Sequence, residues 1–367
     1  MRAFHVLLGV LFLFSTHARA SRTSYRNAHP IAWMHMLPVG ETPGWTETAW
    51  INFELNHANV WNLDAEFRDK RTHDIYRYQA DFEQSSAIFD IGFSLNERWA
   101  FSTEVAYANR SGGFLDDFID QFHTLIGSDR FLRHLNDEYD NSYIVQVDRA
   151  NRLATEQSQG IGNVKAKLKY WMWKWQSPTP GICDCGFALS AQAKFPTQPR
   201  KFGLSSGTND YSGLAHLGAP IFKYSAAWAT AGVTKLGPNR TFDGWPRRDW
   251  QQMYELSLDL GVNESLGFLM QARAESPFFD PDHMEFQYHY TEPKSRSTER
   301  GASGWNSLTA WRGSQSIGMR WRWPGGSQAN LLLIEDWGLG DRDNRGEAVY
   351  VNNAPDIALI SQWHFVF

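Results

Sequence analysis

Apolar and polar residues alternate along most of the chain beyond residue 44. The run 45–56 (WTETAWINFELN) alternates in this way, and the runs 250–262 and 264–275 repeat the pattern. Because successive side chains of a strand point to opposite faces, a period of two predicts strands with one apolar and one polar face. Each run is about ten residues long, the length that lets a tilted strand cross a bilayer.

The connections between these runs alternate between short and long. Short turns are predicted at 96–98, 176–184, 218–220, 261–264 and 324–326. Long polar segments are predicted near 57–74, 110–160, 197–208, 237–248, 276–304 and 338–355. Outer-membrane barrels have this asymmetry, with short periplasmic turns and long extracellular loops. The connections predict an all-β fold: a single antiparallel transmembrane β-barrel of twelve strands over residues 45–367, with both chain ends on the periplasmic side.

One further run leaves an alternative strand count open. Residues 142–148 (SYIVQVD) also have the pattern of a strand, and fourteen strands result if they enter the wall. We predict instead that 110–160 is one long extracellular excursion. The first strand, near 45–56, then closes against the last, near 356–367, so that no strand edge is left unpaired in lipid.

A helical pattern interrupts the strands at about 114–126. The apolar residues of this stretch form one stripe of an α-helix, and they are Phe114, Leu115, Phe118, Ile119, Phe122, Leu125 and Ile126. Burying each such side chain stabilises by roughly 1.5–3 kcal/mol, so the stripe needs a surface. Helices that lie on membranes usually carry Lys or Arg on the polar face, but this face is acidic. We therefore expect the helix to plug the extracellular mouth or upper lumen.

The two ends of the chain predict its destination. Residues 1–20 have a charged start, a short apolar core and small residues before a cleavage point after Ala20, which is typical of a cleaved signal peptide. Residues 21–44 are rich in Pro and Gly and are expected to be irregular. The last strand places Trp363, Phe365 and Phe367 on one face. This signature, which the barrel-assembly machinery reads, predicts the outer membrane of a Gram-negative bacterium.

Composition agrees with that location. Aromatic residues make up 15% of the chain and Trp alone numbers 17, as expected if aromatic girdles flank an apolar band in contact with outer-membrane lipid. The net charge of −5 is mild, so nucleic acid is not an expected partner.

Two clusters could carry chemistry. A polar face of the predicted helix, which could hold a divalent cation or supply a general base, contains Asp116, Asp117, Asp120 and His123. The structural alternative is an acidic first turn favoured by the helix dipole. Cys183 and Cys185 are the only cysteines; they could form only a strained small ring, and zinc would need further ligands from elsewhere. No cofactor, metal or catalytic residue is assigned.

Charged residues on the polar faces of the strands are expected to line the lumen. They are Lys165, Lys167, Lys169, Glu255, Asp259, Arg273, Arg320, Arg322 and Glu335. Charges of both signs are expected either in a solvated pore or in a salt-bridged barrel core, and the pattern does not separate the two.

A set of short motifs carries a family resemblance. In chain order they are Asp81-Phe-Glu83, Asn96-Glu-Arg98, Ser111-Gly-Gly-Phe-Leu-Asp116, Phe118-Ile-Asp120, Phe122-His123, Gly160-Ile-Gly162, Lys194-Phe-Pro-Thr197, Glu335-Asp336 and Pro355-Asp356. The set resembles the proteobacterial outer-membrane family catalogued as domain of unknown function 3187. The resemblance implies a β-barrel in the outer membrane and implies no activity.

Three functions remain open at this point. The first is a channel or transporter for small solutes, with the helix-bearing loop as its plug. The second is a non-catalytic surface or structural barrel that binds a partner. The third is an outer-membrane hydrolase that uses the His123 and Asp cluster. Nothing in the sequence names a solute, and the balance of the motifs leans away from an enzyme.

Overall fold

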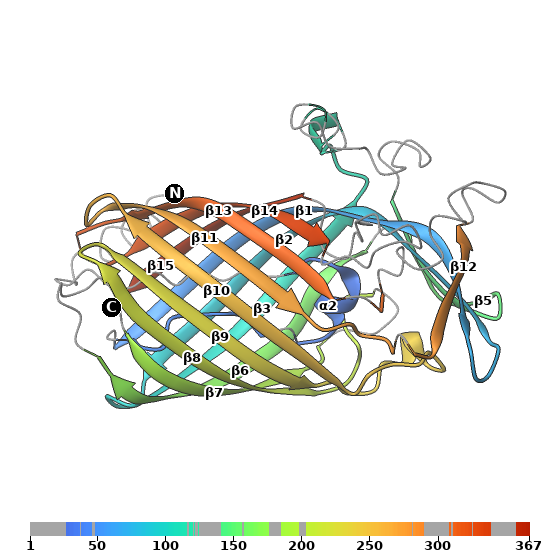
Figure 1. Ribbon diagram of the computed structural model, residues 1–367, viewed down its shortest axis with the longest axis horizontal. Coiled ribbons are helices and arrows are strands. Elements are labelled where there is room, and N and C mark those ends of the chain that lie inside the picture. The colour runs from blue at the N-terminus through green and yellow to red at the C-terminus, as the bar shows by residue number, and fades with distance from the viewer. Residues whose placement is uncertain are drawn as a thin grey trace, which may run out of the picture.

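Twelve antiparallel strands close into one barrel (Figure 1). The computed structural model describes residues 27–36, 38–45, 48–115, 117–119, 121, 124, 141–155, 158–175, 185–197, 203–280, 282–289, 308–309, 311–324, 326–338 and 357–367. The barrel strands are β1 (Ala49–Asp69), β2 (Ile75–Ser94), β3 (Trp99–Ser111), β6 (Ser158–Lys174), β7 (Gly186–Phe195), β8 (Asp210–Phe222), β9 (Ser225–Lys235), β10 (Trp250–Gly261), β11 (Leu266–Glu275), β13 (Arg312–Arg322), β14 (Gln328–Gly338) and β15 (Ile357–Val366). β1 pairs with β15 from Trp50 to Asn59, which closes the wall. The predicted twelve-strand antiparallel barrel is confirmed.

Three further strands extend the sheet beyond the wall. β4 (Ser142–Val147) and β5 (Ala150–Thr155) form a hairpin, and β4 pairs with residues 76–81 of β2. The barrel neighbour β3 pairs with the other part of β2, residues 83–94. β12 (Met284–His289) likewise pairs with the outer end of β1. The strand predicted at 142–148 therefore exists but lies outside the wall, and the fourteen-strand alternative is wrong.

Two predicted connections are also wrong. The loop expected at 57–74 is largely strand, because β1 and β2 continue as a long hairpin that turns at 70–74. The polar residues there resemble a loop because this part of the hairpin leaves the lipid band. The turn expected at 218–220 lies within β8, and the chain turns three residues later, at Lys223 and Tyr224. A register shift after Pro220 accommodates the missing N–H of that proline.

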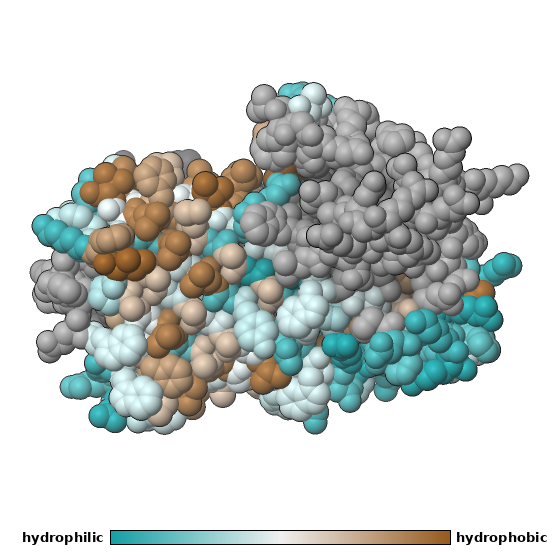
Figure 2. Space-filling model, in the orientation of Figure 1, coloured by the Kyte–Doolittle hydropathy of each residue, from teal (hydrophilic) through white to brown (hydrophobic). Residues whose placement is uncertain are grey.

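The wall is apolar outside and polar inside. On β10, the outward side chains of Tyr254 and Leu256 are exposed, whereas Glu255, Ser257 and Asp259, which point to the other face, are buried. Figure 2 shows hydrophobic side chains spread over the barrel wall, with hydrophilic ones toward the end that carries β5 and β12. An exposed apolar band of this kind needs lipid rather than water around it.

The described helices are short. α2 (Pro30–Met34) lies within the barrel, and the 3-10 turn η3 (Arg240–Phe242) lies in a long connection. Over the part of the chain that the structure describes, no helix has the length and apolar character needed to cross a membrane. Residues 117–119 of the predicted helix are helical, while Asp116, Asp120 and residues 122–123 and 125–126 lie outside the described residues.

Most of the buried apolar side chains gather at the end of the barrel that carries the long connections. This loop-end cluster joins Tyr78 and Phe82 of β2, Tyr143 of β4, and Phe242 and Trp245 of the β9–β10 connection. Ile31 and Met34 of α2 belong to the same cluster. The core of the molecule therefore caps the loop end and holds α2 there.

Candidate functional site

Residues 27–45 thread the bore from one end to the other, and we call them the N-terminal plug. At the loop end, the Asn27 side-chain amide donates to Glu275 at the end of β11, at 3.0 Å. At the turn end, Trp45 packs on Trp171 of β6, with ring centroids 5.6 Å apart. Figure 1 shows α2, the helical part of the plug, inside the barrel.

Asp210, the first residue of β8, anchors the plug near the loop end. One carboxylate oxygen accepts from the Met36 backbone N–H at 2.8 Å and from His35 Nδ1 at 3.2 Å. The same oxygen lies 2.8 Å from the ammonium of Lys194 in β7. His35, Lys194 and Asp210 are almost fully buried. Charge-assisted hydrogen bonds of this kind are the strong ones, so the plug is tied to two neighbouring strands at this point.

Side chains of the wall donate hydrogen bonds to the carbonyl at the end of α2. Lys194 Nζ donates to the Met34 carbonyl at 2.8 Å, and Asn163 Nδ2 of β6 donates to the same carbonyl at 3.2 Å. The last carbonyls of a helix have no partner within it, so these donors replace the missing bonds. At the start, the His29 ring accepts from the Ile31 N–H, and Pro30 occupies a position where no N–H is needed.

Arg273 of β11 holds the middle of the plug. Its guanidinium donates to the Pro38 carbonyl at 2.7 Å and pairs with Glu255 at 3.3 Å and Glu275 at 2.6 Å. Gly40 passes so close to the wall that a Cβ there would lie 1.8 Å from the Glu255 carboxylate. Only glycine fits at this point of the plug without moving the carboxylate.

The lower part of the plug is held by lysines of β6. The Glu41 carboxylate lies 3.0 Å from Lys167 Nζ and 3.6 Å from Lys169 Nζ. Lys169 also donates to the Thr42 carbonyl. These contacts and those of Arg273 are made by side chains, so the plug is joined to the wall without any strand pairing among its described residues.

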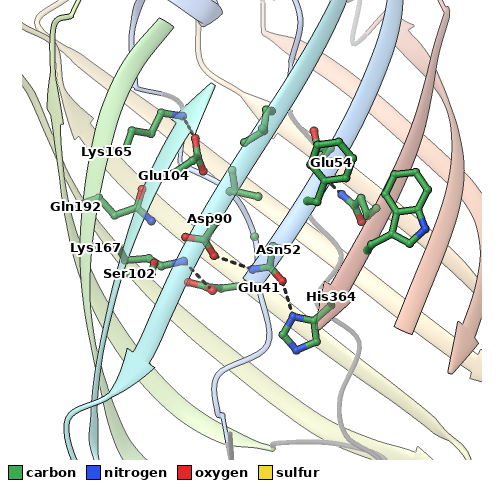
Figure 3. A pocket seen from close by; sticks show the side chains of 16 residues that line it. Glu41, Asn52, Glu54, Asp90, Ser102, Glu104, Lys165, Lys167, Gln192 and His364 are labelled. Carbon is green, nitrogen blue, oxygen red and sulfur yellow. Dashed lines mark hydrogen bonds and ion pairs between the residues drawn. The ribbon is translucent and has the colours of Figure 1, made fainter. Parts of the chain in front are cut away.

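A small polar cavity remains beside the plug (Figure 3). It measures about 70 Å³, and its lining includes Glu41, Asn52, Asp90, Lys165 and Glu104. Asn52 donates to Asp90 at 2.6 Å, and Lys165 pairs with Glu104 at 3.1 Å. This volume accommodates only a few waters.

Burial sets the protonation of the plug histidines. Burial lowers the pKa of His35 from its ordinary value, and this effect outweighs the opposing attraction of the Asp210 carboxylate. Burial likewise lowers the pKa of His29 well below its ordinary value, with the charges of Arg312 and Arg110 adding to the effect. Both side chains are neutral at neutral pH.

The charges predicted for the lumen are mostly found there. Lys167 and Lys169 bind the plug, Lys165 lines the cavity, and Glu255 pairs with Arg273. On the opposite wall, Arg320 Nε lies 2.8 Å from Asp259 and Arg322 Nη2 lies 3.9 Å from it. Glu335 is different, because it alternates with buried Ile334 and shares the outward face of exposed Leu331.

The predicted loop helix does not enter the bore with its described residues. Phe114 is 68% exposed and Phe118 is 50% exposed, while Ile119 is buried and Leu115 is half-buried. Figure 1 shows the helical turn standing outside the wall. Asp117 is exposed, and Phe122, His123, Leu125 and Ile126 lie outside the described residues with Asp116 and Asp120. Among the described residues, no three His, Cys, Asp or Glu side chains are grouped as metal ligands.

The remaining predicted residues lie at the turn end. Trp363 and Phe365 of β15 face outward, and Trp363 stacks on Phe53 of β1 at 5.5 Å between centroids. Phe367 pairs its backbone with Ala49. Cys185 is disulfide-bonded, and Cys183 lies outside the described residues.

The solved structures that resemble this chain are distant. An outer membrane channel from Pseudomonas putida F1 is 12% identical, with 90% of this chain and 100% of that chain covered and a TM-score of 0.46. The CymD monoaromatic hydrocarbon channel is 10% identical, with 88% and 89% covered and a TM-score of 0.33. LpxR from Salmonella typhimurium is 9% identical, with 86% and 100% covered and a TM-score of 0.38. None of the three informs the function of this chain.

The family comparison is more direct. No curated protein matches the chain. The model of a family described as protein of unknown function (DUF3187) matches residues 10–292, well over half of the chain. The match confirms the resemblance that the Gly-Gly-Phe-Leu-Asp motif and its companions indicated. The chain belongs to the DUF3187 family.

Proposed function

We propose that the protein is an outer-membrane channel for small polar solutes, closed in this state by its own N-terminal plug. The observation that carries the proposal is the way the plug is attached. Residues 27–45 fill the bore, yet none of those described pairs with the wall as a strand. Asp210, Arg273 and Lys167 hold them through side chains, and the Ser206 N–H adds one backbone hydrogen bond to the Met34 carbonyl at 3.2 Å. Each such contact is worth only about 0.5–3 kcal/mol net, because water can replace it. The plug can leave while the wall keeps its ladder.

The solute class follows from the surface that the plug covers. The wall facing it carries Lys167, Lys169 and Arg273 beside Glu255 and Glu275. A bore lined by charges of both signs favours hydrophilic solutes over apolar ones. Twelve strands enclose a lumen narrower than that of the large porins, which limits the solutes to small molecules.

The location is supported by the outer surface. The wall exposes large apolar side chains such as Phe89, Ile91 and Leu256. The last strand carries the outward Trp363 and Phe365 beside the chain end. These features favour a barrel that is inserted by the barrel-assembly machinery and surrounded by lipid. A cleaved signal peptide at residues 1–20 is the delivery route that we propose with it.

The structure offers two candidate plugs, and the first is favoured. The N-terminal plug lies inside the bore with buried polar anchors, as Asp210 shows. The loop helix has Phe114 and Phe118 largely exposed, and Phe114 stacks on His57 on the outer face of the wall. We therefore assign closure to residues 27–45 and not to residues 112–127.

Two deletions test the proposal by planar-bilayer recording of the purified protein. Removal of residues 27–44 should raise single-channel conductance strongly, because it empties the bore. Removal of residues 112–127 should leave conductance near that of the intact protein, because the described residues of that segment lie outside the wall. Barrel formation in each variant is checked by the shift in electrophoretic mobility on heating.

A third variant guards against misfolding of the deletions. Asp210→Asn keeps the plug but removes the charge that Lys194 and His35 contact, so it should produce frequent brief openings. The matched control, Asp243→Asn, changes an exposed carboxylate in the β9–β10 connection and should behave like the intact protein. A folded 27–44 deletion that conducts no better than the intact barrel would refute the channel.

A further inference from the structure

Three side chains on the outer face of the wall form a second polar site. His57 of β1 stands opposite Ser85 of β2, and Glu83 lies two residues before Ser85 on the same face. His57 Nδ1 lies 2.8 Å from Ser85 Oγ, and His57 Nε2 lies 2.8 Å from Glu83 Oε2. The three groups therefore form one continuous chain of hydrogen bonds from hydroxyl to imidazole to carboxylate.

The arrangement has the order of a nucleophile, a base and a group that orients the base. A proton on Nε2, donated to Glu83, leaves Nδ1 free to accept the Ser85 hydroxyl. Such a serine is activated by removal of its proton as it attacks. The exposures match the roles: the Glu83 side chain is 1% exposed and that of His57 is 24% exposed, while Ser85 is open at the surface.

The family motif that runs from Ser111 builds one side of this site. The N–H groups of Phe114 and Leu115 both donate to Glu83 Oε1, the first at 2.7 Å. Gly113 has φ +67°, and a Cβ there would lie 1.8 Å from the Glu83 carboxyl carbon. The Phe114 ring stacks on His57, with centroids 4.9 Å apart and planes 10° apart. The motif thus fixes both the carboxylate and the imidazole.

The site lies at the edge of the apolar band. Directly below Ser85 on the outer face of β2 come Ala87, Phe89 and Ile91, of which Phe89 is 48% exposed and Ile91 52% exposed. Above it, Ser111 and the glycines of the motif lead into the long connection. A nucleophile at this height faces the region where the ester bonds of membrane lipids lie, between the acyl chains and the head groups.

We propose that Ser85, His57 and Glu83 form a catalytic triad that hydrolyses acyl esters of lipids lying against the outer wall. The site is on the opposite face of the wall from the bore, so it is independent of the channel. Its substrate class is the ester-linked acyl chain, whether carried by a glycerophospholipid or by lipopolysaccharide. It differs from the His123 and Asp cluster that the sequence suggested.

The reaction balances with water as the only co-reactant. Ser85 Oγ attacks the ester carbonyl carbon while its proton passes to His57 Nδ1. The tetrahedral intermediate expels the alcohol, which takes that proton, and an acyl ester of Ser85 remains. Water then attacks the same carbon, giving its proton to His57 Nδ1. The bond to Ser85 Oγ breaks, the fatty acid leaves, and the serine recovers its proton. Glu83 accepts from Nε2 throughout and stabilises the imidazolium.

A donor for the developing oxyanion is available on the next strand. Asn109 of β3 stands opposite Ser85, on the side away from His57. Residues paired in this way have Cβ atoms about 4.5–5.5 Å apart, so the Asn109 amide can reach a carbonyl bound at Ser85. Its place in the register makes Asn109 part of the proposed site.

The same contacts would exist if the cluster served only to hold residues 112–115, so the test must detect chemistry. The purified full-length protein in detergent is treated with a fluorophosphonate probe, which labels activated serines covalently. Peptide mass mapping should place the label on Ser85. Ser85→Ala should abolish labelling, and His57→Asn should reduce it about 100-fold or more through loss of the base. Ser86→Ala, one residue away and facing inward, is the matched control and should label normally.

Lipid turnover identifies the source of the ester. Fatty acid release is measured from mixed micelles of phosphatidylethanolamine and, in a separate arm, from lipopolysaccharide. We expect release in at least one arm, reduced about 100-fold or more in Glu83→Gln, Asn109→Ala and Ser85→Ala relative to Ser86→Ala. The proposal fails if Ser85 in folded protein is not labelled, or if Ser85→Ala releases fatty acid at the rate of the intact protein. Bilayer conductance should be the same in Ser85→Ala and the intact protein, so either function can fail alone.

Discussion

His35 joins the plug to β8 through one ring nitrogen and to the β9–β10 connection through the other. Nδ1 donates to Asp210 at 3.2 Å, and Nε2 accepts from Asn239 Nδ2 at 3.2 Å. A second ring proton would face the Asn239 donor, so this arrangement requires the neutral ring. The other charges that act on His35 are those of Lys194 and Arg247, and both oppose protonation.

The plugged state should therefore weaken in acid. Burial lowers the pKa of His35 in the plugged state, so its contribution to plug binding is fully present above 6.5, the ordinary value. The contribution is lost as the pH falls below that value, because only the released plug takes up the proton. His29 adds to the effect with the same sign, and it faces Tyr78, Arg110 and Arg312. Channel opening recorded from pH 8 to pH 5 should increase below about 6.5.

A neutral substitute separates His35 from the general effects of acid. In His35→Gln the side chain cannot gain a proton, so the rise in opening with acid should be smaller than in the intact protein. His73→Gln, at an exposed position of the β1–β2 turn, is the control and should keep the full response. Identical opening at pH 8 and pH 5 in the intact protein would contradict this account.

For single residues, the sequence predicts which face of a strand a side chain lies on, but it does not predict which distant residue that side chain contacts. Alternation along β10 and β11 correctly placed Glu255, Asp259 and Arg273 toward the interior, because parity is a local property. Glu335 was misplaced because it follows four consecutive apolar residues, which carry no parity signal. Leu332 and Ile334 of that run face inward, where they pack with the loop-end cluster. The contact between His35 and Asp210 joins residues 175 positions apart in the sequence, so no local pattern predicts it.

The strands of the first hairpin are twice as long as a bilayer needs. β1 has 21 residues and β2 has 20, against 10 in β11. Their outer halves support β4, β5 and β12 and line the loop-end cluster. One strand therefore serves two environments, lipid in one half and protein in the other, and its hydrophobic pattern changes between them. That change is why the sequence indicated a loop from residue 57.

The lipid-facing halves should respond to charge according to depth. Leu256 lies in the middle of β10 and is 53% exposed on the outer face. Leu256→Arg should cost about 2–4 kcal/mol of folding free energy, because it places a cation in the apolar band. Phe222→Arg, at the turn end of β8, should cost at most about 1 kcal/mol. Urea unfolding in lipid vesicles measures both, and equal costs would argue against a membrane around this wall.

The two ends of the whole barrel differ in kind. The turn end has short connections such as 95–98, while the loop end carries the extended hairpins and the apolar cluster. In an outer-membrane barrel the longer connections face outward. A single cysteine introduced at Thr72 should therefore react with a membrane-impermeant maleimide on intact cells, and one at Glu97 should not. Both positions are exposed in the structure, so reaction at Glu97 alone would invert the assignment.

The barrel could be predicted as a whole because its signals are repeated. The alternation of side chains recurs in every strand, and short and long connections alternate around the wall. Single errors at 57–74 and 218–220 therefore did not change the predicted number of strands. The plug had no such redundancy. Residues 27–45 contain one helical turn and otherwise no period, because their structure is imposed by the surfaces they cross. The outer site was missed because His57, Ser85 and Phe114 meet only after three strands pair.

The plug also constrains the order in which the molecule is made. Asn27 reaches Glu275, 248 positions later, so this contact cannot form until β11, the ninth of the twelve wall strands in chain order, is in place. The wall closes where β1, its first strand in chain order, pairs with β15, its last. Sealing that seam encloses a segment that already belongs to the same chain. Every finished barrel then contains one N-terminal plug in a fixed orientation, and no separate plug protein has to be secreted and bound.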